Sequence, residues 1–184
     1  MKKEKQMTMN NEKQSAFKNI LFVCTGNTCR SCMAEGFFNN SIKKDDFLKA
    51  NYISSSAGIL AWEGEPANAD STEVMASKYG IDISECKARR ISNKIIEKSQ
   101  LILTMTLEHK DFILSGYPNT ASIIFTLKEY ANFLDINRPA VFDSYGFDVE
   151  DPYNLEHEIY VKCAEEISGL VDKVIKRLTD NSKC

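Results

Sequence analysis

The sequence has no apolar run long enough to cross a membrane. Its N-terminus carries Lys2, Lys3 and Lys5 but lacks the apolar segment of a secretory signal. The formal net charge is -3, which gives no indication of nucleic-acid binding. There is also no internal repeat and no linker that divides the chain. We therefore expect one cytoplasmic domain, a monomer or weak dimer without membrane or nucleic-acid partners.

Metal-ligand clusters are scarce as well. Cys29 and Cys32 have the spacing of a zinc knuckle or a redox pair, but no second Cys-x2-Cys accompanies them. His109 and His157 stand apart from each other and from the cysteines. The sequence therefore predicts no metal and no other cofactor. Six cysteines at irregular spacing, without a secretory signal, indicate a reducing compartment.

The most informative segment is a short polar loop between an apolar run and a helical pattern. The run Ile20–Val23 is followed by Cys-Thr-Gly-Asn-Thr-Cys-Arg-Ser at positions 24–31, and residues 33–38 have helical spacing. A strand, a small loop and a helix N-terminus in this order form an anion site from backbone N–H groups and the helix dipole. The segment therefore predicts binding of a tetrahedral oxyanion.

Cys24 opens this loop and Arg30 closes it, with five residues between them. The Arg30 guanidinium can bind two oxygens of one anion as a planar fork. Loop amides, the helix dipole and this cation all favour a thiolate at Cys24, so we expect a reactive sulfur. Two alternatives stay open: a cysteine after a strand is often a small buried hydrophobe, and Cys-x5-Arg also arises by chance.

Apolar strands alternate with amphipathic helices along the rest of the chain. We predict strands over 18–23, 51–56, 101–105 and 122–125, and helices over 31–44, 66–79, 92–98, 107–114, 127–133 and 155–178. This order favours a three-layer, doubly wound α/β fold with a four-stranded parallel sheet, in which ligands bind beyond the carboxyl ends of the strands. Residues 1–17 are expected to be a disordered extension of a single domain over 18–184, and 135–150 a long functional loop.

The loop at 24–31 resembles the signature of the low-molecular-weight protein tyrosine phosphatases. With Thr28 it is most similar to the bacterial protein arginine phosphatases within that family. Further similar motifs are Ser-Ser-Ala-Gly at 55–58, Leu-Ile-Leu-Thr-Met-Thr at 101–106 and Asp-Pro-Tyr at 151–153. The resemblance spans about residues 18–180 and implies a sheet order of 2-1-3-4 and phosphorylated proteins as substrates.

The resemblance also implies roles for three residues. Cys24 is expected to attack phosphorus and form a phosphocysteine, Arg30 to hold the phosphoryl oxygens, and Asp151 to protonate the leaving group. Asp151 also has a structural interpretation, since Asp before Pro is a good helix N-cap. Asp148 and Glu150 are the next candidates for the acid, and as neighbouring acids they can favour its protonated form.

Other residues are expected around the substrate. The resemblance implies that Ser31 donates to the Cys24 sulfur, and that Asn27 adopts a left-handed backbone and binds Ser56. The alternative for Ser31 is a serine at the start of the helix. The resemblance allows Cys29 to form a protective disulfide with Cys24; its alternative is a buried thiol. The full set of predicted substrate-binding residues is Thr25, Gly26, Asn27, Thr28, Cys29, Ser31, Trp62 and Tyr153.

Thr28 bears on the substrate. Tyrosine-directed members of the family usually carry a bulkier aliphatic residue there. A guanidinium can donate hydrogen bonds to the Thr28 hydroxyl, whereas a phenol ring packs better against an aliphatic group. We therefore favour phosphoarginine over phosphotyrosine as the substrate. A packing variant is the alternative interpretation of Thr28.

The sequence departs from the family at Cys32, where Pro is usual, and near Ser84, where many members have His. Two rival functions stay open. An arsenate reductase would need two relay cysteines on one segment, and only Cys86 is available there, with Cys163 on the last helix. A non-catalytic phosphoprotein-binding module would not need Cys24 or Asp151.

Overall fold

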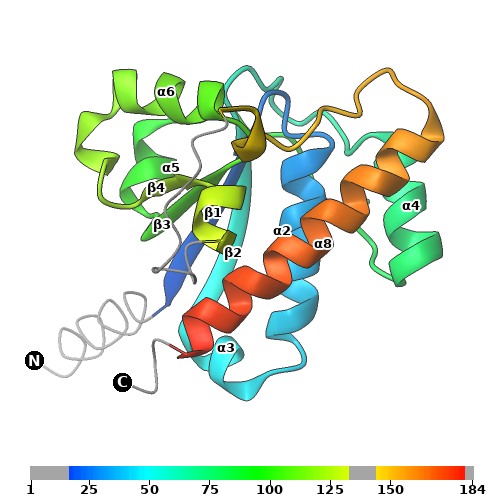
Figure 1. Ribbon diagram of the computed structural model, residues 1–184, viewed down its shortest axis with the longest axis horizontal. Coiled ribbons are helices and arrows are strands. Elements are labelled where there is room, and N and C mark those ends of the chain that lie inside the picture. The colour runs from blue at the N-terminus through cyan, green and yellow to red at the C-terminus, as the bar shows by residue number, and fades with distance from the viewer. Residues whose placement is uncertain (1–16, 133–143, 181–184) are drawn as a thin grey trace, which may run out of the picture.

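The computed structural model describes residues 17–132 and 144–180. Its sheet contains four parallel strands, β1 (Lys18–Cys24), β2 (Tyr52–Gly58), β3 (Leu101–Thr104) and β4 (Ile124–Thr126), in the order β2-β1-β3-β4. The predicted doubly wound α/β fold and its sheet order are therefore confirmed. The central strand β1 pairs with both β2 and β3 (Figure 1).

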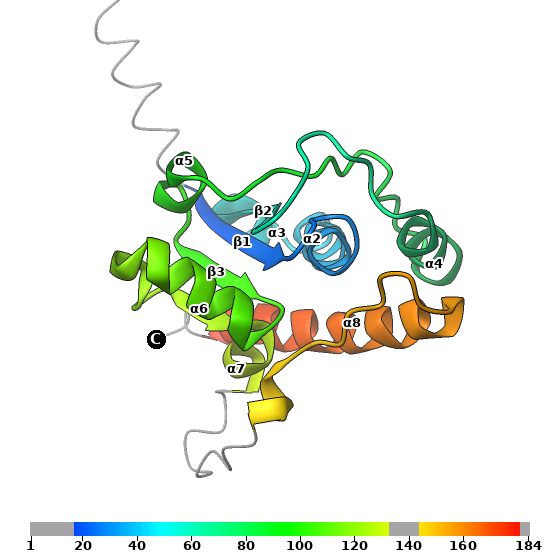
Figure 2. The ribbon, with the colours of Figure 1, turned by 90° about the horizontal axis from the view of Figure 1, so that it is seen from above.

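Helices cover both faces of the sheet. The described helices are α2 (Arg30–Ile42), α3 (Asp46–Asn51), α4 (Ala69–Tyr79), α5 (Asn93–Glu97), α6 (Leu107–Gly116), α7 (Leu127–Asn132) and α8 (His157–Asp180), with 3-10 turns at Pro118–Thr120 and Ser144–Phe147. Figure 2 shows α5 and α6 on one side of the sheet and α2, α4 and α8 on the other. Among the described residues, no helix combines the length and hydrophobicity of a membrane span.

The alternation of side chains along β1 explains the two layers. Ile20 and Phe22 belong to the large core that contains α2 and α8, whereas Leu21 and Val23 belong to a smaller core under α5 and α6. All four side chains are buried, as expected for a strand inside a parallel sheet. This double burial fixes the end of β1, and hence Cys24, in the middle of the molecule.

Several predicted boundaries needed correction. The helix predicted from Pro66 begins at Ala69, because the side chain of Asn68 caps it by accepting the Ser71 N–H, while Pro66 pairs with Lys87 in an isolated bridge. The helix ends at Tyr79, as predicted, and Gly80 follows it in a left-handed conformation with φ of 65°.

Two further elements differ from the predictions. The last helix begins at His157 rather than Leu155, and a short helix over Asp46–Asn51, capped by Asp45, was not predicted. The expected disorder of 1–17 lies outside the described residues except for Phe17, as does 135–143 of the predicted loop.

Candidate active site

The loop of residues 24–30 lies at the carboxyl end of β1 and leads directly into α2. Asn27 has the predicted left-handed backbone, with φ of 58°. Cys29 is the N-cap of α2, and no side chain caps this helix end. The first N–H groups of α2 therefore lack side-chain acceptors and are available to an anion at the loop.

The Cys24 sulfur receives hydrogen bonds from two directions. The Asn27 N–H lies 3.2 Å from Sγ, and Ser31 Oγ lies 3.0 Å from it. Because Asn27 Nδ2 donates to Ser31 Oγ at 2.9 Å, the Ser31 hydroxyl proton is free to point at the sulfur. Both donors stabilise a thiolate, so the arrangement provides a nucleophile at the floor of the loop.

Arg30 is almost completely buried beside this sulfur, with 4% of its surface exposed. Its Nη1 donates to the Val149 carbonyl at 3.1 Å, and its Nη2 contacts Thr25 Oγ1 at 3.4 Å and forms an ion pair with Asp151. Its Nε has no hydrogen-bond partner in the described part of the chain. A buried guanidinium N–H without an acceptor is costly, and an anion bound in the loop would satisfy it.

Asp151 reaches the loop from the segment before α8. One carboxylate oxygen pairs with Arg30, and the other accepts the Tyr153 N–H at 3.2 Å. The alternative role of Asp151 as a helix N-cap is wrong, because α8 begins only at His157. Of the two other acids considered, Asp148 accepts the Leu107 N–H at 2.8 Å, and neither it nor Glu150 lines the cavity described next.

These groups surround a cavity of about 270 Å³. The predicted residues that line it are Cys24, Thr25, Gly26, Thr28, Cys29, Arg30, Trp62, Asp151 and Tyr153; Leu60 and Glu65 were not predicted. The side chains of Trp62 and Tyr153 are 80% and 55% exposed, so both stand at the cavity mouth. Asn27 and Ser31 do not line the cavity and instead support the loop from behind.

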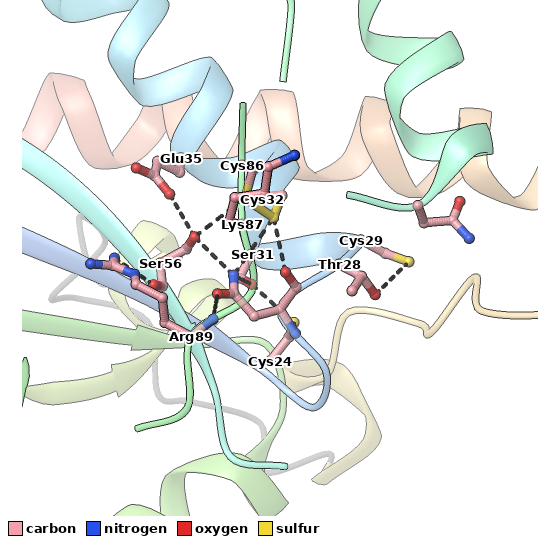
Figure 3. The surroundings of a disulfide bond; sticks show 12 residues. Cys24, Thr28, Cys29, Ser31, Cys32, Glu35, Ser56, Cys86, Lys87 and Arg89 are labelled. Carbon is pink, nitrogen blue, oxygen red and sulfur yellow. Dashed lines mark hydrogen bonds between the residues drawn. A yellow bond between two sulfur atoms is a disulfide. The ribbon is translucent and has the colours of Figure 1, made fainter. Parts of the chain in front are cut away.

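The support behind the loop is a hydrogen-bond network centred on Asn27. Its Nδ2 donates to Ser56 Oγ at 2.8 Å, as predicted, and its Oδ1 accepts the Arg89 N–H at 2.9 Å. Ser56 Oγ in turn donates to Glu35 at 2.5 Å, and the Arg89 guanidinium binds the Ser56 carbonyl (Figure 3). The segment around Arg89 therefore helps to support the loop. It lies shortly after Ser84, near which many family members have His.

A disulfide joins Cys32 on α2 to Cys86 beside this network (Figure 3). The sequence pointed to Cys32 only through its spacing from Cys29 and its departure from the family's Pro, and this pair was not predicted. The bond also differs from the reduced cysteines that we expected from a reducing compartment. Cys24 and Cys29 are free thiols in the structure. Burial is the main cause that raises the pKa of Cys29, which therefore stays protonated.

His109 also lies at the site, although its sequence context suggested no role for it. It lies in the first turn of α6, is 3% exposed, and its Nε2 lies 2.9 Å from Thr25 Oγ1. Burial, followed by the charge of Arg30, lowers the pKa of His109 to about 4, although Asp151 opposes this shift. The imidazole is therefore neutral at pH 7. Its position shortly after β3, at the carboxyl edge of the sheet, was the signal that could have identified it.

Few residues suit a metal. Within residues 17–132 and 144–180, Asp70, Glu73 and His157 bring ligand atoms to within 4.8 Å of one another, but none of them lines the cavity. Cys32, part of the zinc-like spacing, is occupied by its disulfide.

Comparisons with known proteins show which family the chain resembles. A family model described as low molecular weight phosphotyrosine protein phosphatase matches residues 19–183. The protein-arginine-phosphatase of Bacillus subtilis (strain 168) is 35% identical over 159 residues, covering 86% of this chain and 95% of that protein. The probable low molecular weight protein-tyrosine-phosphatase EpsP of Ralstonia nicotianae is 33% identical over 161 residues, covering 88% and 96%. A crystal structure of a low molecular weight protein tyrosine phosphatase from T. tengcongensis is 42% identical, with a TM-score of 0.75, covering 87% of this chain and 99% of that one.

Proposed function

Because the chain belongs to the low-molecular-weight phosphotyrosine protein phosphatase family and is an enzyme of that family, we propose that it hydrolyses phosphoarginine in proteins through Cys24. The observation that carries the mechanism is the buried Arg30 Nε, which has no partner among the described residues and lies next to a hydrogen-bonded cysteine sulfur. A phosphoryl group in the loop would accept from this N–H and from the N–H groups that open α2. Phosphoryl transfer depends mainly on such positioning and charge compensation.

In the proposed first step, the Cys24 thiolate attacks phosphorus in line with the leaving group. A phosphorus–sulfur bond forms while the bond to the substrate nitrogen breaks. The departing guanidine takes a proton from the Asp151 carboxyl, which lies at the same cavity. An arriving phosphoryl group competes with Asp151 for Arg30, so substrate binding would release that carboxyl from its ion pair.

In the second step, Asp151 removes a proton from water, which attacks the phosphocysteine. Phosphate leaves, and the Cys24 thiolate is restored with its Ser31 hydrogen bond. No metal or other cofactor enters either step. We also propose a cytoplasmic location, phosphorylated proteins as partners, no nucleic-acid partner, and a monomeric or weakly dimeric state.

Thr28 supports arginine as the substrate residue. It lines the cavity, its side chain lies 3.6 Å from the Cys29 sulfur, and its backbone carbonyl accepts the Asn68 N–H at 2.9 Å. These contacts hold Thr28 at the cavity wall, where its hydroxyl can accept from a guanidinium. The similarity to the protein-arginine-phosphatase of Bacillus subtilis points the same way.

Phosphotyrosine is the second candidate. The T. tengcongensis protein, described as a tyrosine phosphatase, is 42% identical to this chain. The aromatic side chains of Trp62 and Tyr153 at the cavity mouth could stack on a phenol ring. Arsenate reduction is less well supported, because burial raises the pKa of Cys163 to about 12 and leaves it a poor relay nucleophile.

A side-by-side assay tests the proposal. The enzyme should release phosphate from matched peptides that carry either phosphoarginine or phosphotyrosine. Its kcat/KM should be higher on the phosphoarginine peptide. Arsenate should not be reduced. Cys24→Ser should abolish turnover of both peptides while phosphate still binds. Thr28→Ile should shift the preference toward phosphotyrosine; an unchanged ratio would remove Thr28 as a reason for the arginine assignment.

A further inference from the structure

The cavity contains a second carboxylate that the mechanism does not use. Glu65 lines the cavity together with Cys24, Arg30 and Asp151, although it comes from a distant part of the chain. The residue is exposed, and its carboxylate forms no hydrogen bond or ion pair within the described residues. The neighbouring Glu63 differs, since its carboxylate accepts the Arg90 N–H at 2.8 Å.

The backbone of Glu65 is held firmly although its side chain is free. Its N–H donates to the Trp62 carbonyl at 3.2 Å, and its carbonyl accepts the Ala88 N–H at 2.8 Å. The next residue, Pro66, forms a β-bridge with Lys87, beside the disulfide at Cys86. The fixed backbone keeps Glu65 at the cavity wall, and its carboxylate, which has no partner among the described residues, is available to a ligand there.

The charges of the cavity explain what this carboxylate can bind. Among the described residues that line it, Arg30 is the one cation. Its charge pairs with Asp151 and, in the proposed mechanism, with the phosphoryl oxygens. Glu65 therefore adds a negative charge without a partner, which gives no advantage to a neutral phenol. A guanidinium supplies both a positive charge and planar N–H donors that match a carboxylate.

We propose that Glu65 is a specificity-determining residue, whose carboxylate binds the guanidinium of a phosphorylated arginine and so selects this leaving group over a phenol. This inference rests on the proposed function and deepens it. The exposed ring of Trp62, whose carbonyl fixes the Glu65 backbone, stands at the same cavity mouth and can cover a guanidinium face.

The test compares Glu65→Gln with Glu63→Gln on two peptides that differ only in carrying phosphoarginine or phosphotyrosine. Removing the Glu65 charge should lower the ratio of kcat/KM for phosphoarginine to that for phosphotyrosine about tenfold, mainly through a higher KM for phosphoarginine. Glu65→Lys should lower the ratio further. Glu63→Gln should leave the ratio unchanged, because its carboxylate binds backbone outside the cavity.

A salt titration gives an independent measurement. The wild-type ratio should fall as NaCl screens the pair, and the ratio of Glu65→Gln should respond less. A wild-type preference for phosphoarginine that Glu65→Gln leaves intact would overturn the role of Glu65 but not the proposed function. Equal losses on both peptides would show a structural role instead and overturn it too. A wild-type preference for phosphotyrosine would overturn the proposed function and this inference together.

Discussion

At the scale of single residues, Arg30 and Asp151 form the ion pair around which the chemistry is arranged. The guanidinium is buried and the carboxylate is half exposed, with 45% of its side chain accessible. The acid can therefore exchange protons with water, whereas the cation stays fixed in the loop. This difference suits the roles proposed for them: Asp151 donates a proton, and Arg30 binds the phosphoryl oxygens.

Asp151→Asn should therefore slow reactions with poor leaving groups far more than reactions with good ones. An amide cannot deliver the proton that an unactivated leaving group needs, and general acid catalysis contributes on the order of 100-fold or more. The measurement is kcat for a series of aryl phosphates with increasing phenol acidity, together with the phosphoarginine peptide. Equal losses across the series would argue against Asp151 as the acid.

Because the neutral imidazole of His109 is buried, we expect the stability of the protein to depend on pH. The ordinary pKa of an imidazole is 6.5, whereas that of His109 in the folded protein is about 4, so the unfolded chain binds more protons between these values. The stabilising contribution is complete above pH 6.5 and is lost as the pH falls toward 4, on the order of 3 kcal/mol in total. Urea unfolding of His109→Gln should show a flatter dependence than wild type over this range. Parallel curves for the two proteins would contradict the burial of a neutral imidazole.

The residue scale also shows what sequence reasoning can reach. The left-handed conformation of Asn27 and its bond to Ser56 were predicted, because both roles follow from the resemblance of the loop to the family signature. His109 and the Val149 carbonyl were not, because they meet Thr25 and Arg30 only through the tertiary fold. The position of His109 after a predicted strand indicates the right edge of the sheet, but its particular contact, across 84 residues of sequence, is set by the tertiary fold.

At the scale of elements, the loop depends on how closely β2 approaches it. A Cβ atom at Gly58, the last residue of β2, would lie 2.5 Å from the Thr25 carbonyl oxygen and 2.9 Å from the Asn27 nitrogen. Both neighbours are backbone atoms of the loop itself and cannot turn away as a side chain could. The end of β2 therefore constrains the backbone conformation of the loop through direct contact.

Gly58→Ala should displace the loop and lower kcat/KM by at least tenfold, with a stability loss of about 1–3 kcal/mol. Gly169→Ala on α8 is the matched control: a Cβ there meets open space, and replacing an exposed helical glycine should raise stability by up to about 1 kcal/mol. Activity assays and urea unfolding of both variants check this. Wild-type activity in Gly58→Ala would mean that the loop tolerates the contact.

The Cys32–Cys86 disulfide links α2 to the segment that supports Asn27, across 54 residues of sequence. Closing a loop of this length should stabilise the fold by about 4 kcal/mol. Reduction, or the double variant Cys32→Ala with Cys86→Ala, should therefore lower the Tm by roughly 10 °C. Alkylation under denaturing, non-reducing conditions should leave both cysteines unlabelled, and their labelling would contradict the bond.

At the scale of the whole molecule, the fold was predictable because its signal is repeated along the chain. Strands alternate with helices along the chain, and this order alone favours a parallel sheet covered on both faces. The disulfide and the short helix Asp46–Asn51 were not predicted. A disulfide partner depends on distances between elements, and a helix of six residues leaves too little periodicity to detect.

The fold also makes the stability of the molecule depend on what the loop binds. Any anion that binds only the folded state stabilises it, by about 2.7 kcal/mol at one hundred times its Kd. Inorganic phosphate at such a concentration should therefore raise the Tm of the wild type by roughly 5–10 °C. Cys24→Ser should keep this shift, because the amides and Arg30 remain in place.

Arg30→Lys should lose most of the same shift, each variant being compared with its own phosphate-free baseline. A lysine cannot replace the buried guanidinium N–H groups, among them the unpartnered Nε within the described part of the chain. Sodium chloride at matched ionic strength separates specific binding from screening. A full phosphate shift in Arg30→Lys, or an equal shift with chloride in the wild type, would show that the anion stabilises the protein elsewhere than in the loop that Cys24 opens.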